Sequence, residues 1–386
     1  MKVLEWFALN LTYILVYEQY IVDQQRLHDY LFTEYNSAIP AIKPVNPNLT
    51  IADLENSTGY DPFMLTISLA MFKLIEVKES EEKLSAIYEF AMTYKDNRLQ
   101  WDPREFNNID HIYTNADKIW IPECPIVDSH SQDLFDTIYT RQAIINSNGS
   151  VTVYAPYVIS IVCRYDIRKF PFDTQNCPIS MVSYSFQITE FRYNFQLGLV
   201  KSLEELGNSE WILEDIDIFK LPLVDNATGL LFNEINSFVV TLKRNYMFYL
   251  TMVIIPSFVV NTLSIVGIFI QTSDLISKLT VCLTSIMSMT FILGILQDSM
   301  PKTKDLPVLA IYVTVNMILM VAAIAIIVVY PILKQKYVNF LAKYDIRIFG
   351  PRKRDKPTWR EHFTVNRICM VIFQAANLIN FIYLLT

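Results

Sequence analysis

The chain has 386 residues, a formal net charge of −7, 52% apolar residues and 18% charged residues. The acidic balance argues against nucleic-acid binding, because a protein that neutralises phosphates needs a basic face. The apolar excess is concentrated after residue 247, which predicts two structural units, the second of them in a membrane. The four histidines have no metal-ligand spacing and no catalytic motif is visible, so we expect no enzyme, no metal and no cofactor.

Residues 1–20 are predicted to be a signal peptide, because Lys2 precedes an apolar stretch of the right length. Glu5 interrupts that stretch, which leaves an ordinary buried helix as the alternative. A short amphipathic helix is expected next, from Gln24 to Tyr35.

Residues 21–246 are predicted to form an extracellular β-sandwich. Short strand-like runs such as Val151–Val162 alternate with turn clusters, as in sandwich domains. The four Asn-x-Ser/Thr sequons within residues 21–246 predict N-glycosylation of an exported domain, and they precede the first long apolar run. The predicted glycosylated residues are Asn48, Asn56, Asn148 and Asn226.

Residues 247–386 are predicted to form a transmembrane domain of four helices. About 20 apolar residues cross a hydrocarbon core of about 30 Å. The segment 334–367 is rich in Lys and Arg, which marks it as a cytoplasmic loop by the positive-inside rule and places the β-domain outside. The predicted spans are 247–270, 279–297, 308–333 and 368–386.

The second span carries hydroxyl groups at helical spacing among its apolar residues. A face of this kind lines a pore or, alternatively, packs against a neighbour through interhelical hydrogen bonds. Residues three and four apart share one face of a helix. That face comprises Thr280, Thr284, Met287, Phe291, Gly294 and Asp298.

The segment Cys163–Cys177, with Phe170-Pro171-Phe172-Asp173 inside it, closely resembles the signature loop of the Cys-loop receptors, the pentameric ligand-gated ion channels. The resemblance extends over nearly the whole chain, through Trp120-Ile-Pro122, Lys243-Arg244 and the second span. It implies a disulfide between Cys163 and Cys177. It also implies four further subunits in a homo- or heteropentamer around one pore, in contact with membrane lipid. The implied location is the plasma membrane, multi-pass with an extracellular N-terminus, with the synapse as one option.

By this resemblance, Met287 occupies the gate at mid-pore and Phe291 lies one turn outward. Asp274 and Asp298 would form inner and outer acidic rings, which favour cations. Ser277 stands where cation-selective members carry an acid, so an anion-selective channel stays open as an alternative. The bulk of Phe291 leaves open an accessory subunit that does not conduct alone.

The resemblance also implies a cluster that couples ligand binding to gating. Pro171, Asp173, Lys243 and Arg244 are expected to meet the turn at Glu76–Glu79 near residues 300–306. Charges of opposite sign attract more strongly at a site half out of water, although a plain structural salt bridge is the alternative.

For the extracellular agonist, the resemblance assigns Tyr184 and Phe232 to an aromatic box that suits a cation. A packed core aromatic is the alternative for Tyr184. The paired cysteines of acetylcholine-binding subunits are missing, and Glu89 and Val127 replace expected aromatics. The sequence therefore predicts a small-molecule agonist without identifying it.

Overall fold

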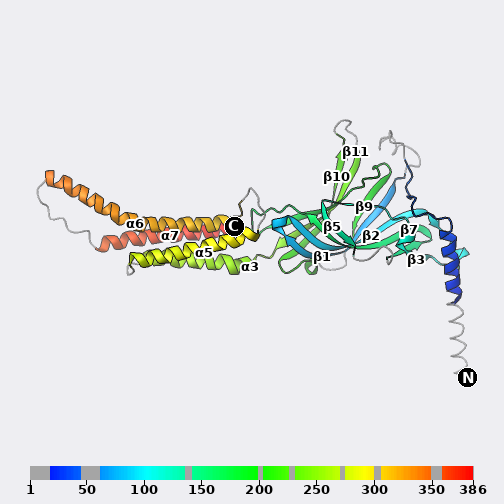
Figure 1. The fold of residues 1–386 in the computed structure, drawn as a ribbon, viewed down its shortest axis with the longest axis horizontal. Coiled ribbons are helices and arrows are strands. Elements are labelled where there is room, and N and C mark those ends of the chain that lie inside the picture. Colours follow the sequence, from blue (N-terminus) through cyan, green and yellow to red (C-terminus); the bar gives the residue numbers. More distant parts are fainter. Residues whose placement is uncertain are drawn as a thin grey trace, which may run out of the picture. The chain divides into compact units, whose positions relative to one another are not determined.

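The computed structural model (Figure 1) divides the chain into two compact units. The first comprises Met1–Lys78, Glu82–Arg164 and Gln175–Leu242, and the second comprises Glu79–Glu81, Tyr165–Thr174 and Lys243–Thr386. The structure describes residues 18–44, 61–134, 141–198, 203–225, 231–269, 274–299, 306–348 and 359–385. Most of the predicted signal segment 1–20 lies outside these ranges, as do Asn48, Asn56 and Asn226.

The first unit begins with a helix over residues 18–32, drawn in dark blue in Figure 1. The helix already includes residues 18–20, so it extends further toward the N-terminus than the predicted helix from Gln24 to Tyr35. Leu27 and Leu31, four residues apart, are its buried face, which fits the amphipathic pattern.

Among its described residues, the first unit contains two β-sheets. The seven-stranded sheet has the order β3-β6-β7-β2-β1-β9 with β5 paired to β7, and the four-stranded sheet has the order β10-β11-β8-β4. The strands are β1 (Phe63–Lys78), β2 (Lys83–Gln100), β3 (His111–Asn115), β4 (Ile126–Val127), β5 (Ser129–Leu134), β6 (Gln142–Asn146), β7 (Asn148–Val162), β8 (Thr174–Met181), β9 (Phe191–Leu197), β10 (Trp211–Val224) and β11 (Leu231–Arg244).

The core of this unit lies where the inner faces of the two sheets meet. Phe195 on β9 stacks on Phe238 of β11 with 4.4 Å between ring centroids, and Phe90 of β2 lies 6.1 Å from Phe238. Buried residues alternate with more accessible ones along most of β2, as expected for strands with one face in a core. The β-sandwich predicted from the sequence is therefore confirmed.

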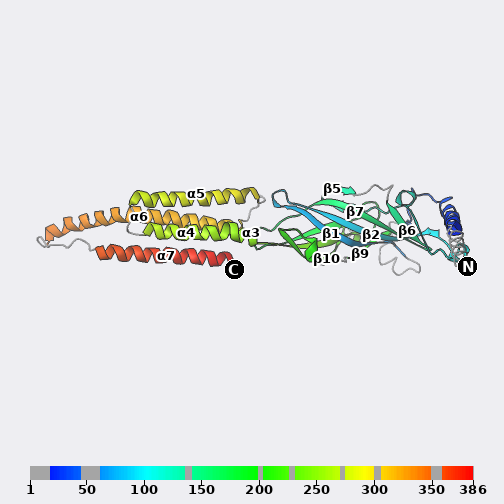
Figure 2. The same ribbon diagram turned by 90° about the horizontal axis from the view of Figure 1, so that it is seen from below.

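The second unit contains the long helices, which lie side by side in Figure 2. Among the described residues, four helical segments are long and apolar enough to cross a membrane, which confirms the predicted four-helix fold class. A π-helical turn, η5 (Leu250–Ile254), precedes Pro256, whose missing N–H removes a helical hydrogen bond. The other helices are α3 (Met247–Tyr249), α4 (Ile255–Phe269), α5 (Leu275–Ser299), α6 (Val308–Ile348) and α7 (Trp359–Leu385).

The segment 334–367, predicted as a loop, is helical at both ends. Helix α6 continues to Ile348 and α7 begins at Trp359. Lysine and arginine end a membrane-compatible run but are good helix formers, so the helix continues beyond the hydrophobic span. Gly350 and Pro351, which disfavour helix, follow soon after α6 ends.

Buried asparagines join three of the helices. The Asn261 amide on α4 donates to Asn377 on α7 at 2.7 Å, and Asn377 donates to the Thr262 hydroxyl at 3.0 Å. The Asn380 amide on α7 donates to Asn316 on α6 at 2.8 Å. We refer to Asn261, Asn316, Asn377 and Asn380 as the asparagine cluster. It lies beside an apolar cluster that includes Ile265 and Phe373.

Candidate functional site

A disulfide between Cys163 and Cys177 closes the predicted signature loop, and the Cα atoms of the two cysteines are 5.3 Å apart. The peptide bond between Phe170 and Pro171 is cis. The loop residues Tyr165–Thr174 belong to the second unit, together with the helices. The loop therefore brings its own charged and aromatic side chains into the unit that contains the membrane-length segments.

Arg244 lies at the centre of a buried charge cluster in the second unit. Its Nε donates to Asp173 Oδ1 at 2.8 Å and its Nη2 to Asp173 Oδ2 at 3.2 Å, a bidentate pair. Its Nη1 lies 2.7 Å from Glu79 Oε1. The side chain of Arg244 is 0% exposed, so both carboxylates act on it with little screening by water. We call Glu79, Asp173 and Arg244 the arginine cluster.

Burial lowers the pKa of Arg244, but the hydrogen bonds to Asp173 and the charges of Asp173 and Glu79 outweigh it and raise the pKa overall. Arg244 therefore stays charged. Burial, followed by the nearby Glu79 carboxylate, raises the pKa of Tyr165, whose phenol stays neutral beside the cluster.

Aromatic rings link the arginine cluster to the first membrane-length segment. The guanidinium carbon of Arg244 lies 4.7 Å from the ring centroid of Phe170 and 5.8 Å from that of Tyr249 on α3. Phe170 and Tyr249 meet edge to face at 4.7 Å. The backbone N–H of Val308, at the start of α6, donates to the Arg168 carbonyl at 3.0 Å. The disulfide loop thus contacts both α3 and α6.

The predicted convergence is therefore seen for Glu79, Asp173 and Arg244, while residues 300–305 lie outside the described ranges. Lys243, which the sequence reasoning treated like Arg244, is exposed. Adjacent residues on a strand point to opposite faces, so only one of the two basic residues on β11 enters the cluster.

The predicted pore face lies on α5. Met287 is 75% exposed and Phe291 is 70% exposed, and Thr280 and Thr284 are exposed on the same face. The Thr284 hydroxyl donates to the Thr280 carbonyl at 2.8 Å, so it is satisfied within its own helix. Gly294 is exposed as well.

The alternative for this hydroxyl-bearing face was an interhelical hydrogen bond. A residue of α5 outside the face makes such a bond. Ser285 is buried and shares a hydrogen bond with Ser264 on α4. Asp274 is exposed immediately before α5, and its carbonyl accepts from the Lys278 N–H. Asp298 falls on α5, but its side chain lies outside the described residues.

The structure brings the segments of the two predicted ligand-binding aromatics together. Tyr184 is 71% exposed and Phe232 is 50% exposed, so Tyr184 is not a packed core residue. The Ile188 N–H donates to the Phe232 carbonyl at 3.2 Å, and Asn233 Nδ2 donates to the Ser183 carbonyl at 2.7 Å. These bonds hold the segment around Tyr184 against the start of β11.

Glu123 organises this site and was missed by the sequence reasoning. Its carboxylate accepts from the Ser183 hydroxyl at 2.9 Å and from the N–H and hydroxyl of Ser185 at 3.1 and 2.9 Å. Tyr184 lies between these two serines. The available signal was an acid directly after the Trp120-Ile-Pro122 motif.

Of the remaining predicted residues, Asn148 is exposed, and its Oδ1 accepts from the Ser150 N–H at 2.9 Å. The Tyr94 hydroxyl donates to the Trp120 carbonyl. Among the described residues, no group of three or more His, Cys, Asp or Glu side chains is arranged to hold a metal ion.

The comparisons with known proteins agree with this geometry. Residues 24–246 match the model of the neurotransmitter-gated ion-channel ligand binding domain. The chain is 26% identical to neuronal acetylcholine receptor subunit alpha-6 of Homo sapiens over 79% of its own length and 58% of that protein. It is 24% identical to subunit alpha-3 of Rattus norvegicus, over 91% of the chain and 64% of the relative. It is 27% identical to subunit beta-4 of Gallus gallus, over 73% and 59%.

The chain thus spans about three fifths of the length of the curated relatives that it matches. The domain match covers more than half of the chain and ends at residue 246, directly before α3. With the disulfide loop and the four membrane-length helical segments, this match shows that the chain belongs to the neurotransmitter-gated ion-channel family, the Cys-loop receptors.

Proposed function

We propose that the chain is one subunit of a pentameric ion channel in the plasma membrane, opened by an extracellular small-molecule agonist and selective for cations. The arginine cluster is the observation that carries the proposal, because it joins Glu79, Asp173 and Arg244 from three distant parts of the chain. Each of these segments is directly continuous with the first unit: η1 (Glu79–Glu81) follows β1, the disulfide loop connects β7 to β8, and Arg244 ends β11.

A device for coupling needs a rigid connection with two available arrangements. The cluster supplies the rigidity, because a buried guanidinium that loses one carboxylate is left with an uncompensated charge. Displacement of the strand ends would therefore move Arg244, the Phe170–Tyr249 ring pair and α3 as one body. The start of α6 would follow through the Arg168–Val308 hydrogen bond.

The exposed face of α5 is the proposed pore lining. A ring of five Met287 side chains would form an apolar constriction that gates by dewetting. Asp274 would add a ring of negative charge at the inner mouth and Asp298 one at the outer mouth, which supports cation selectivity.

The agonist is proposed to bind at Tyr184 and Phe232, with Glu123 positioning Tyr184 through the serines on either side of it. Exposed aromatic faces next to a carboxylate suit a small organic cation. The relatives are named acetylcholine receptor subunits, but this chain lacks, between Leu221 and Leu231, the paired cysteines expected of acetylcholine-binding subunits, so acetylcholine itself is not proposed.

One observation favours a second candidate, an accessory subunit of a heteropentamer. Phe291 is 70% exposed on the same face as Met287, and five phenylalanines at one level would narrow the conduit. A mixed pentamer in which other subunits carry smaller residues at that level would relieve the narrowing.

A chimera tests the proposal. It places the whole second unit, that is Glu79–Glu81, Tyr165–Thr174 and residues 243–386, beneath a related extracellular domain with a known agonist. Including the first two segments keeps the arginine cluster intact. We expect agonist-evoked current whose reversal potential follows sodium and not chloride. A reversal that follows chloride would overturn the selectivity.

Absence of current from chimeras that reach the surface would favour the accessory subunit. The matched variant Phe291→Leu separates the two readings further. Under the accessory interpretation it restores current to a silent chimera. Under the first interpretation it changes only the conductance.

A further inference from the structure

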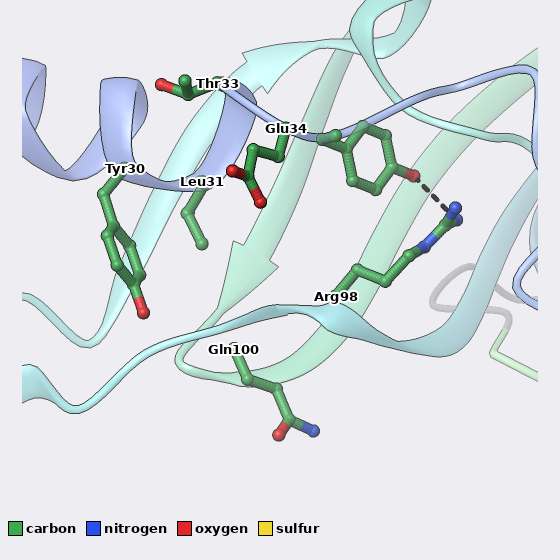
Figure 3. A pocket seen from close by; sticks show the side chains of 7 residues that line it. Tyr30, Leu31, Thr33, Glu34, Arg98 and Gln100 are labelled. Atoms are coloured by element: carbon green, nitrogen blue, oxygen red, sulfur yellow. Dashed lines mark hydrogen bonds between the residues drawn. The ribbon is translucent and has the colours of Figure 1, made fainter.

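A cavity of about 600 Å³ lies between the N-terminal helix and strand β2 in the first unit, away from Tyr184 (Figure 3). This volume is within the range of small-molecule sites. Helix and post-helix residues line one side and β2 residues the other. The lining residues are Tyr30, Leu31, Thr33, Glu34, Tyr35, Arg98 and Gln100.

We propose that this cavity is a second, modulatory binding site for a small organic cation, connected to the candidate agonist site through hydrogen bonds at both ends of the backbone segment 120–123. The binding half of the proposal is independent of channel activity, whereas the modulatory half rests on the function proposed above.

The charges of the lining favour a cation. In Figure 3 the Glu34 carboxylate lies between the helix and β2, beside Leu31, and Tyr30 lines the same cavity. Within the part of the chain that the structure describes, no hydrogen bond or ion pair engages this carboxylate. The Tyr30 ring lies 5.4 Å from the Phe106 ring between centroids but is still 62% exposed, and an exposed ring attracts an ammonium group through its quadrupole.

The arginine in the lining is already occupied and does not select an anion. Arg98 donates to both carboxylate oxygens of Asp96, at 2.9 and 2.7 Å, so the two charges cancel. It also donates to the Tyr35 hydroxyl at 3.3 Å and to the Asn36 carbonyl at 3.4 Å. Four of its five N–H groups are thus engaged. The net charge of the lining comes from Glu34.

Hydrogen bonds at both ends of the short backbone segment 120–123 connect this cavity to Tyr184. The Tyr35 hydroxyl donates to Asp96 at 2.9 Å and accepts from the Trp120 N–H at 3.0 Å. Burial raises the pKa of Tyr35 to about 12, so the phenol keeps its proton at neutral pH. Trp120 is followed after two residues by Glu123, which holds the serines on either side of Tyr184. A ligand against Tyr35 would therefore restrain the loop that presents Tyr184.

The binding test uses benzyltrimethylammonium, an aromatic quaternary cation, with the full chain purified in lipid nanodiscs. The variant Tyr184→Ala disables the candidate agonist site, so that binding measured by calorimetry in this background reports the new site. We expect saturable binding that Glu34→Gln weakens about fivefold, since one exposed charge–cation contact is lost.

The matched control is Glu18→Gln, which removes the same charge from an exposed position at the other end of the helix that precedes Glu34, outside the lining. Equal affinity in the Glu34→Gln and Glu18→Gln variants would overturn the site. Loss of all binding in Tyr184→Ala would also overturn it and would leave the agonist site of the proposed function standing. The reverse result, with Glu34-dependent binding and none at Tyr184, would count against the agonist site alone.

Hydrogen–deuterium exchange tests the connection. The Ser185 N–H donates to Glu123 and the Phe186 N–H to the Ser183 hydroxyl, so both amides report on the loop around Tyr184. In the Tyr184→Ala background we expect the probe to slow their exchange. Tyr35→Phe keeps the ring but removes the hydroxyl, and it should abolish the slowing without abolishing binding. Exchange that the bound probe leaves unchanged would overturn the modulatory role.

Discussion

The second unit contains two buried polar clusters that differ in charge. In the arginine cluster, the one guanidinium is engaged by two carboxylates and two aromatic rings. In the asparagine cluster, neutral amides bridge α4, α6 and α7 with single hydrogen bonds, and Asn261 Oδ1 is left unpaired among the described residues. A buried ion requires compensation from every side, whereas a buried amide tolerates incomplete pairing at smaller cost.

This difference in charge predicts that the two clusters have different roles, one in coupling and the other in holding helices together. Segments that share a buried ion move together, because parting them exposes an uncompensated charge. Helices that share amide hydrogen bonds in a membrane are held by weaker contacts, on average about 0.6 kcal/mol each. We therefore expect the arginine cluster to transmit displacement and the asparagine cluster to hold α7 against its neighbours.

Arg244→Met gives the largest expected effect. It leaves Asp173 and Glu79 buried without their cation, which destabilises a protein by about 3–5 kcal/mol. We expect loss of folded, surface-expressed protein, measured by surface biotinylation and by the melting temperature of the solubilised chain. The control is Lys243→Met, which removes the same charge from the exposed neighbour and should leave both unchanged. Equal losses in the two variants would show that burial of Arg244 is not the cause.

Asn377→Leu gives a smaller effect, because it removes two neutral hydrogen bonds, those to Asn261 and Thr262. We expect a loss of about 1–2 kcal/mol, measured as unfolding in a detergent titration of the full chain. Asn261→Leu with Asn377→Leu should recover part of the loss, since the Asn261 amide is then no longer buried without its partner. A single-variant loss as large as that of Arg244→Met would contradict the distinction between the clusters.

The features that could be predicted from the sequence are those that depend on local properties of the chain. The sandwich and the four spans follow from strand alternation and from the lengths of apolar runs, which are local properties of the chain. The disulfide loop and Asp173 were found because they lie within one short motif. Contacts between residues distant in sequence were predicted only where each of the two residues lies in a recognised motif.

What escaped prediction depends on single-residue register and on long-range contacts. Lys243 and Arg244 are chemically alike, and only the strand register determines that Arg244 is buried and Lys243 exposed. Glu123 lies 60 residues from Ser183, its hydrogen-bond partner, and nothing local in the sequence connects them. The extension of α6 to Ile348 was missed because hydropathy reports the membrane boundary and not the end of the helix.

Replacing the whole arginine cluster gives the smallest expected effect on stability. It also tests whether the cluster couples ligand binding to gating or is only a structural salt bridge. In Glu79→Leu, Asp173→Leu and Arg244→Met together, no buried charge is left unpaired. Replacing a buried ionic group by apolar residues of similar volume is often neutral or stabilising, so surface expression of the chimera should match that of the unsubstituted chimera. Agonist-evoked current should remain absent, because the charges that tie the loop, η1 and β11 together are gone. If current returns together with expression, the cluster is a structural salt bridge, and coupling must run through the Phe170–Tyr249 contact and the Arg168–Val308 hydrogen bond instead.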